Sequence, residues 1–450
     1  MGIAGTRNQE IYDVVGIGFG PSNLSLAIAL EEHGASVPQH PVEAHFFERQ
    51  PTFGWHRNML LPSTTMQISF LKDLATFRNP MSRFSFTSYL HASDRLVQFV
   101  NSQDFYPTRQ EFHQYLEWAA AGFSDRVTYG AEVTSIRPLR GGDTLTPDLL
   151  EIEARTADGA TKVVAARNVA LSTGLVPRLP KDVTADERVW HSSEFLSRFH
   201  TVAPQDLRSV AVVGAGQSAA EITQFLHSSL PHAQVSAVIP SYGYSVADDT
   251  PFANQVFDPA AVDAYYFGTG QGRDAFWRYH RNTNYSVVDA DVIRDLYQRT
   301  YDEDVRGTRR LHFRNLTRVT EVKRSGDETT VGLRSLLDDR TEELAVDALV
   351  FATGYDQLDP AHLLHDFDRY FARDADGRHR VERDYRLVTA SDLTCGVYLQ
   401  GGTEHSHGLT SALLSNLAVR SGEIADSIVL RRTGRAREHT RPVEASPSAA

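Results

Sequence analysis

Cysteine is almost absent from the chain, with Cys395 the one cysteine among 450 residues. A single cysteine cannot form an internal disulfide or a Cys-x-x-Cys redox pair, which excludes a disulfide-stabilised scaffold and a dithiol reductase. Long hydrophobic runs are absent as well, and none approaches the roughly 20 residues that a membrane helix needs. The first residues also lack the apolar core of a signal peptide. We therefore expect a cytoplasmic protein without a membrane partner.

Positive charge is scarce relative to negative charge, with 45 Lys and Arg against 57 Asp and Glu and a formal net charge of −12. Nucleic acids are bound through clustered Lys and Arg, so no nucleic-acid partner is expected. The 18 histidines show no spacing of the kind that holds zinc, and we predict no metal site. The length allows two or three globular domains.

The chain does contain a strand, a glycine-rich turn and a helix in direct succession near its start. A predicted strand at 11–18 leads into the turn GIGFGPS at 16–22, and an apolar helical pattern follows at 23–31. Such a turn lets a pyrophosphate approach the backbone, while the helix N-terminus supplies unpaired N–H groups. Proline is tolerated in a first helical turn, where the motif normally has its third glycine. The predicted dinucleotide site consists of Gly16, Gly18, Gly20, Pro21 and Ser22.

An acidic residue at the end of the next strand usually binds the ribose of such a nucleotide. The segment HFFE at 45–48 places Glu48 at this position, later than the usual spacing of about 20 residues. A purely structural glycine turn is the alternative. The combination of strand, helix and Glu48 favours nucleotide binding.

A second glycine turn follows a purely apolar strand at 210–213, in the sequence VVGAGQSAAE. Ala219 takes the place of the third glycine, which the motif allows. We expect a nicotinamide nucleotide here. No Lys or Arg occurs at 238–244, where a partner for the 2′-phosphate of NADPH would be expected, so these residues do not distinguish NADPH from NADH. The residues assigned to this site are Gly214, Gly216, Gln217 and Ser218.

Seven segments between about residues 12 and 423 carry a more specific pattern than the two turns alone. They are DVVGIGFGPSNLSLA, MQISFLKDLATFRNP, PTRQEFHQYLEWAA, VAVVGAGQSAAE, NTNYSVVD, FATGYD and HGLTSALLSNLAVRSGEI. A generic protein with two nucleotide turns would not be expected to share all of them. Together they resemble the microbial flavin-dependent N-hydroxylating monooxygenases, which act on the side-chain amine of ornithine or lysine.

The resemblance implies FAD at the first turn and NADPH at the second, with O2 and L-ornithine as further partners. Reduced flavin would form a C4a-hydroperoxide that hydroxylates N5 of ornithine, for a siderophore or another hydroxamate or N–N natural product. No acid–base side chain is required. The implied assembly is a homotetramer.

The implied fold class is α/β, with two Rossmann-like dinucleotide-binding domains and a small, mainly helical substrate-binding region. The FAD domain would be discontinuous, at 8–200 and 345–432. The NADPH domain would occupy 205–344, with the helical insertion at about 245–300. We expect the tail at 433–450 to be disordered because it lacks apolar periodicity.

The family resemblance also assigns substrate residues. Lys72 would bind the α-carboxylate, Asn254 and Asn284 would hold the substrate, and Gln67 would lie close to both flavin and substrate. Local sequence offers plainer alternatives, because Lys72 stands beside Asp73 and Asn is a common turn residue.

Further residues are expected around the flavin. Thr410 precedes a predicted helix at 412–419, whose N-terminus would face the pyrimidine edge of the ring, although Thr410 could equally be an ordinary helix cap. Arg109 belongs to a family motif and is assigned to the cofactor site without a defined role. The expected flavin-site residues are Trp55, His56, Met66, Gln67, Arg109, Thr353, Gly354, Leu409 and Thr410.

Two alternatives to an ornithine hydroxylase stay open. The segment NTNYSVVD at 282–289 resembles ornithine enzymes more than lysine enzymes, but one methylene discriminates by only about 1–3 kcal/mol. An L-lysine N6-hydroxylase, or a flavin monooxygenase of another amine or a carbonyl, is therefore possible. A flavin-binding protein without turnover is disfavoured by Lys72, Asn254 and Asn284 beside two nucleotide turns.

Overall fold

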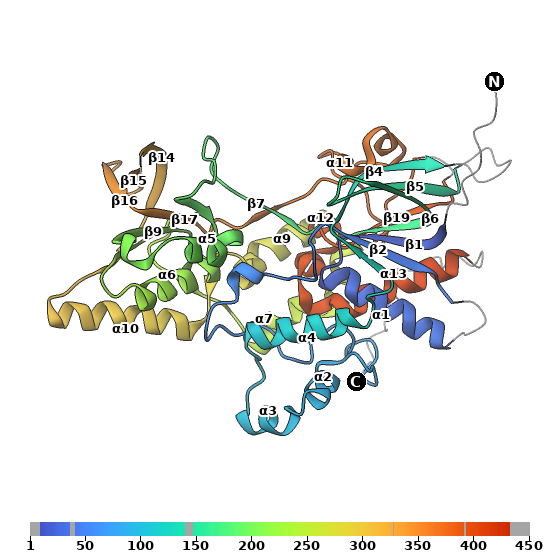
Figure 1. Ribbon diagram of the computed structural model, residues 1–450, viewed down its shortest axis with the longest axis horizontal. Coiled ribbons are helices and arrows are strands. Elements are labelled where there is room, and N and C mark those ends of the chain that lie inside the picture. The colour runs from blue at the N-terminus through green and yellow to red at the C-terminus, as the bar shows by residue number, and fades with distance from the viewer. Residues whose placement is uncertain (1–9, 37–40, 140–146, 327, 391–392, 433–450) are drawn as a thin grey trace.

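The computed structural model describes residues 10–36, 41–139, 147–326, 328–390 and 393–432. The predicted disordered tail at 433–450 lies outside these residues. The molecule has two halves, and each is built around one sheet. The sheet of the first half contains β1 and β6, and the sheet of the second half contains β9 and β17 (Figure 1). Within the described residues, no helix is both long and apolar enough to cross a membrane.

The first sheet has the order β3-β2-β1-β6-β5-β4, and β19 pairs with the part of β6 that β5 leaves uncovered. Pairing is parallel except along β4, β5 and β6, where the strands run antiparallel. The strands are β1 (Ile11–Ile17), β2 (Ala44–Glu48), β3 (Val127–Tyr129), β4 (Ala131–Leu139), β5 (Leu149–Thr156), β6 (Thr161–Leu171) and β19 (Gly396–Leu399).

Two long helices cover one face of this sheet, α1 (Pro21–Ser36) and α13 (Leu417–Arg432). Apolar residues recur on the inner side of both helices, so Leu26 and Ile424 pack with Val14 of the sheet in one buried cluster. The first strand and its helix are therefore placed as the sequence predicted, with β1 ending one residue earlier and α1 starting two residues earlier than expected.

The second sheet is entirely parallel, in the order β13-β10-β9-β17-β8. The helices α5 (Phe195–Thr201), α6 (Gln217–Ser229) and α10 (Ala290–Arg306) cover one face, and an antiparallel meander packs on the other. The sheet strands are β8 (Val189–His191), β9 (Ser209–Val213), β10 (Gln234–Val238), β13 (Leu311–Arg314) and β17 (Ala348–Phe351), and the meander strands are β14 (Thr317–Ser325), β15 (Glu328–Ser335) and β16 (Thr341–Val346).

Two strands belong to a different sheet from the one that the predicted domain boundaries imply. The sequence division placed β8 and β17 with the first sheet, but both hydrogen-bond into the second, where β17 pairs with β9 and β8 pairs with β17. The chain instead passes between the halves as a two-stranded antiparallel ribbon of β7 (Leu175–Pro177) and β18 (Tyr355–Gln357). The remainder of the predicted division stays a prediction.

Short helices fill the space beside and between the sheets. An aromatic cluster holds α2 (Phe86–Ala92), α3 (Leu96–Ser102) and α4 (Arg109–Ala121) against the first half. The segment expected to be a helical insertion does contain helices: α7 (Pro251–Asn254), α8 (Pro259–Tyr266) and α9 (Gly270–His280).

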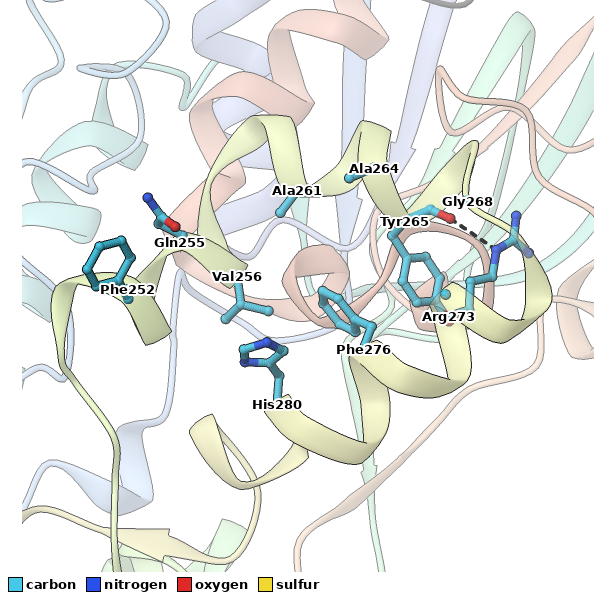
Figure 2. A pocket seen from close by; sticks show the side chains of 11 residues that line it. Phe252, Gln255, Val256, Ala261, Ala264, Tyr265, Gly268, Arg273, Phe276 and His280 are labelled. Carbon is cyan, nitrogen blue, oxygen red and sulfur yellow. Dashed lines mark hydrogen bonds between the residues drawn. The ribbon is translucent and has the colours of Figure 1, made fainter.

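These last helices enclose a small, mostly apolar pocket of about 340 Å³, into which Val256, Phe276 and His280 point (Figure 2). Arg273 lies at its edge and donates to the Tyr265 carbonyl at 3.0 Å.

Gly16 provides a test of the packing behind the first turn. Its neighbour across the register is Phe46, which is fully buried, and a Cβ on residue 16 would lie 2.2 Å from the Phe46 ring. We expect Gly16→Ala to destabilise the FAD-free protein by about 1–3 kcal/mol, measured as a lower Tm. Gly20→Ala is the matched control, because no atom lies within 4 Å of a Cβ there. Equal Tm values for the two variants would contradict this account.

Candidate active site

A cavity of about 2440 Å³ lies between the two halves, and it is lined by residues of the first sheet, of the turns that follow strands of the second sheet, and of the helical segment. Ligand pockets for one small molecule usually measure 300–1,000 Å³, so this cavity has room for more than one ligand. Most of the predicted site residues line it: Gly18, Gly20, Pro21, Ser22, Glu48, Trp55, His56, Met66, Gln67, Lys72, Arg109, Gly214, Gly216, Gln217, Ser218, Asn254, Asn284, Thr353 and Gly354.

Three predicted residues do not line this cavity. Gly16 contacts the Phe46 ring behind the turn, while Leu409 and Thr410 are buried. The prediction of a helix at 412–419 is wrong at its start, because the backbone is extended at Leu413 between two short 3-10 turns. The helix α13 begins only at residue 417. Leu413, Leu414 and Ser415 line the cavity at this place instead.

The first turn has the shape that a dinucleotide needs. Gly18 has φ +82°, and a Cβ there would lie 2.3 Å from the Ser172 carbonyl oxygen, so only glycine fits. The buried Glu48 carboxylate accepts from the Phe19 N–H at 2.7 Å and the Gln50 N–H at 2.8 Å. Each carboxylate oxygen keeps a second acceptor site for a ribose hydroxyl. These residues fit FAD, with its pyrophosphate at the N-terminus of α1.

The second turn has a similar form. Gly214 has φ +150°, and a Cβ there would lie 2.4 Å from the Ala352 carbonyl oxygen. The backbone is extended at Gly216, and α6 begins at the next residue, so the first N–H groups of α6 are directed toward the cavity side. This arrangement fits the pyrophosphate of a nicotinamide dinucleotide.

Asp289 connects Gln67 to Gln217 of the second turn, and it was not singled out from the sequence. Its Oδ1 accepts from Gln67 Nε2 at 2.9 Å, and its Oδ2 accepts from Gln217 Nε2 at 2.8 Å. The Asp289 N–H donates to Gln217 Oε1 at 2.8 Å. Gln67 from the flavin side and Gln217 from the nicotinamide side are therefore held by one carboxylate. Asp289 is the N-cap residue of α10, but its side chain caps no N–H of that helix, so the N-cap pattern in the sequence does not reveal these contacts.

A buried ion pair crosses between the halves beside this network. Arg109 donates from Nη1 and Nη2 to the two Glu221 oxygens, both at 2.8 Å, and from Nη1 to the Met59 carbonyl at 3.0 Å. Glu221 is 3% exposed. A two-point contact of this kind fixes orientation as well as distance. The structure thus gives Arg109 a role between α4 and α6, and its predicted cofactor role stays a prediction.

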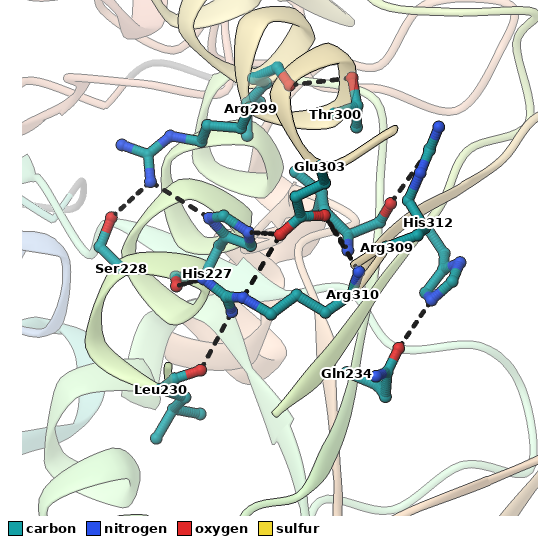
Figure 3. Close-up of polar contacts among 12 residues, drawn as sticks. His227, Ser228, Leu230, Gln234, Arg299, Thr300, Glu303, Arg309, Arg310 and His312 are labelled. Atoms are coloured by element: carbon teal, nitrogen blue, oxygen red, sulfur yellow. Dashed lines mark hydrogen bonds and ion pairs between the residues drawn. The ribbon is translucent and has the colours of Figure 1, made fainter. Parts of the chain in front are cut away.

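A second polar cluster joins the C-terminal parts of α6 and α10 (Figure 3). His227 contacts Glu303 through Nε2 at 2.7 Å and Arg299 through Nδ1 at 3.2 Å. Arg299 can only donate, so Nδ1 accepts and the ring proton sits on Nε2. Burial lowers the pKa of His227, which favours this neutral form. The cluster fixes α10 and so supports Asp289 at its N-terminal end.

Lys72 is placed to bind an anion. Its Nζ lies 5.8 Å from the centroid of the Phe257 ring, and no ion pair with it occurs in the described part of the chain. Its neighbour Asp73 does not pair with it, because the Asp73 carboxylate accepts from the backbone of residues 75, 76 and 86. Burial lowers the pKa of Lys72, and nearby Asp258 partly opposes this shift. A bound carboxylate would stabilise the charged form of Lys72.

The two predicted asparagines, Asn254 and Asn284, belong to the helical segment and line the same cavity. Asn254 lies in α7 and donates from Nδ2 to the Asp249 carbonyl at 2.7 Å, which leaves its Oδ1 as an acceptor for a ligand. Asn284 follows the 3-10 turn after α9. Gln67, Lys72, Asn254 and Asn284 thus come from distant parts of the sequence and line one space, and their substrate roles stay predictions.

Arg178 and Arg281 are among the arginines of the cavity wall that were not predicted. Both are exposed and both act electrostatically on Tyr285, which donates to Glu404. Arg178 also forms an ion pair with Asp356 at 2.7 Å. They come from the ribbon between the halves and from the helical segment, not from the strand end where such a residue was sought, so local sequence could not reveal them.

The described residues contain no group of three or more His, Cys, Asp or Glu that could hold a metal ion.

Comparison with known proteins agrees with this geometry. Residues 10–357 match the family model for L-lysine 6-monooxygenase/L-ornithine 5-monooxygenase. The chain is 39% identical to the L-ornithine N(5)-monooxygenase of Pseudomonas aeruginosa over 434 residues, covering 94% of this chain and 95% of that protein.

Solved structures give the same result. The ornithine N-hydroxylase of Kutzneria sp. 744, solved with reduced FAD, NADP+ and L-ornithine, is 57% identical with a TM-score of 0.90, covering 94% of this chain and all of that one. The L-lysine 6-monooxygenase of Pseudomonas syringae is 31% identical with a TM-score of 0.81, covering 93% and 99%. The chain belongs to the L-lysine 6-monooxygenase/L-ornithine 5-monooxygenase family of flavoenzymes.

Proposed function

We propose that this chain is an FAD- and NADPH-dependent monooxygenase that hydroxylates the side-chain amine of L-ornithine at N5. The observation that carries the proposal is the single cavity in which both nucleotide turns meet Lys72, Asn254 and Asn284. The full-length similarity supports ornithine over lysine, at 57% identity to an ornithine enzyme and 31% to a lysine enzyme. The hydroxylated amine is a precursor of hydroxamates, such as those of siderophores.

The protein's part in the reaction is to bind and orient the reactants and to exclude water. When bound, FAD reduced by NADPH supplies the activation of O2, which is chemistry that amino-acid side chains cannot provide. Lys72 pairs with the substrate α-carboxylate, and the amide oxygens of Asn254 and Asn284 accept from its α-ammonium.

The substrate amine must be neutral to react. An alkyl amine has an ordinary pKa of about 10.4, and removal from water lowers it. The cavity supports this loss of the proton because the positive charge of Lys72 lies in the same space as the substrate. Gln67, held by Asp289, lies between the flavin side and the nicotinamide side and orients the two reacting partners.

Arg178 and Arg281 supply the positive charge for the 2′-phosphate of NADPH. Both line the cavity near Tyr285, and guanidinium groups suit phosphate oxygens. They replace the basic residue that is missing after β10. On family resemblance we also propose a cytoplasmic homotetramer.

Product analysis tests the reaction. With FAD, NADPH and O2, we expect L-ornithine to gain one oxygen atom, detected by mass, at a kcat/KM at least tenfold above that for L-lysine. Putrescine and N-acetylated ornithine, which lack the α-carboxylate or the free α-amine, serve as matched comparisons and should react poorly. A hydroxylated product from another amine but none from ornithine would contradict the proposal, as would FAD binding without NADPH consumption.

Lys72→Ala tests the carboxylate contact. Hydrogen bonds to a charged group contribute about 1.5–3 kcal/mol, so KM for ornithine should rise about 10–100-fold while FAD affinity stays unchanged. Lys323→Ala is the control, since Lys323 is exposed on β14 and pairs with Glu321. An unchanged KM in the Lys72 variant would exclude this role.

Arg281→Ala tests the phosphate contact. We expect KM for NADPH to rise about tenfold, and KM for NADH to stay the same because NADH lacks the 2′-phosphate. Arg178→Ala should act in the same direction, and Arg340→Ala, which removes an exposed arginine at the start of β16, should change neither value. Equal increases for both nucleotides would contradict the assignment.

A further inference from the structure

Arg420, in the first turns of α13, is a buried cation without a carboxylate partner. Its side chain is among the largest that are fully buried, at 2% exposed. Within the described residues it forms no ion pair. Nη1 donates to the Ser411 carbonyl, Nη2 donates to the Ser22 hydroxyl at 3.1 Å, and Nε has no acceptor. Burial lowers the pKa of Arg420 from its ordinary value, and nearby Tyr385 and Glu423 partly oppose this shift without an ion pair to the guanidinium among the described residues.

Nearby carboxylates are engaged by other arginines. Glu423, three residues further along α13, receives two hydrogen bonds from Arg383, at 2.8 and 2.9 Å. Arg431, also on α13, pairs with Glu382 at 2.6 Å. Arg383 and Arg431 thus each have a carboxylate in contact, whereas Arg420 has none in the described part of the chain.

A buried charge without a counter-charge is strongly unfavourable, and proteins normally pair such groups. Packing at this position does not require an arginine, because an apolar side chain of similar length would fill the same space without that penalty. A charge at this position therefore points to an anion that the protein itself does not contain.

The surroundings of Arg420 indicate where that anion lies. Ser22 is the second residue of α1 and lines the cavity beside Gly20 and Pro21. The guanidinium is thus directly behind the turn where the helix N-terminus faces the cavity. The other terminal nitrogen of the Arg420 guanidinium is held by the Ser411 carbonyl. Ser411 lies just before the segment at 413–415, which lines the same cavity.

We propose that Arg420 is the buried counter-charge of the FAD pyrophosphate and acts on it through Ser22. It is a positioning residue, because Ser22 stands between the guanidinium and the cavity. The proposal rests on the placement of FAD at the first turn. Its rival is a brace that merely ties α1 to the turn at Ser411 and has no relation to phosphate.

The two roles differ in the FAD-free protein. A brace stabilises the chain whether or not FAD is present, so Arg420→Met would lower the Tm of the FAD-free protein. A counter-charge without its anion destabilises the FAD-free protein, so Arg420→Met should then keep or raise its Tm. The variant should also lose much of the Tm increase that FAD produces in the wild type.

The direct experiment titrates the full-length, FAD-free protein with FAD and, separately, with riboflavin, followed by flavin fluorescence. Riboflavin carries the same ring without the pyrophosphate. We expect Arg420→Met to raise the Kd for FAD about 10–100-fold and to leave the Kd for riboflavin unchanged. Arg420→Lys should lose less, since it keeps the charge, and Ser22→Ala should weaken FAD alone by several-fold.

Arg431→Met is the matched control, because it removes a paired arginine from the same helix and should lower Tm without changing the Kd for FAD. An unchanged Kd for FAD in Arg420→Met, or equal losses for FAD and riboflavin, would overturn the proposal. If Arg420→Met does not fold, Arg420→Lys and Ser22→Ala decide by the same comparison. A wild-type protein that binds no FAD would instead overturn the placement of FAD itself.

Discussion

The two-point ion pair between Arg109 and Glu221 is the contact on which the shared cavity depends. It joins α4 of the first half to α6 of the second, and Glu221 also accepts from Gln217 at 2.9 Å. From Gln217 the contacts continue through Asp289 to Gln67. Because the Arg109–Glu221 contact is largely buried and directional, we infer that it holds the two nucleotide turns facing one space. Breaking such a pair would leave a buried charge uncompensated.

This arrangement explains how the chain can be an oxidising enzyme by positioning its reactants. The reaction needs two nucleotides and one amine in close contact and away from water, and it needs few reactive side chains. The protein accordingly uses its polar residues for position: Asp289 between two glutamines, Lys72 beside an aromatic ring, and Arg420 behind the first turn. In the proposed function, Lys72 and Arg420 provide positive charge where a ligand brings negative charge.

Local sequence patterns predicted the elements whose conformation depends mainly on residues close in sequence. The first turn, Glu48 at the end of β2 and the second turn all follow from strand and glycine spacing, and the structure has them in place. The start of α13 was not predictable, since Gly408 has φ +76° and Leu413 is extended, which delays an otherwise helical pattern. Asp289 contacts Gln67 across 222 residues, and no local pattern specifies such a pair. The same holds for β8 and β17, whose sheet is chosen by long-range pairing.

The most direct test of the central claim is a crystal structure of this chain with FAD, NADP+ and L-ornithine. The account predicts the flavin pyrophosphate at Ser22, the nicotinamide nucleotide at Gly216, and the ornithine α-carboxylate within hydrogen-bonding distance of Lys72 Nζ. Its side-chain amine would then point toward the flavin ring. An ornithine bound elsewhere, or bound with its α-carboxylate away from Lys72, would contradict the account.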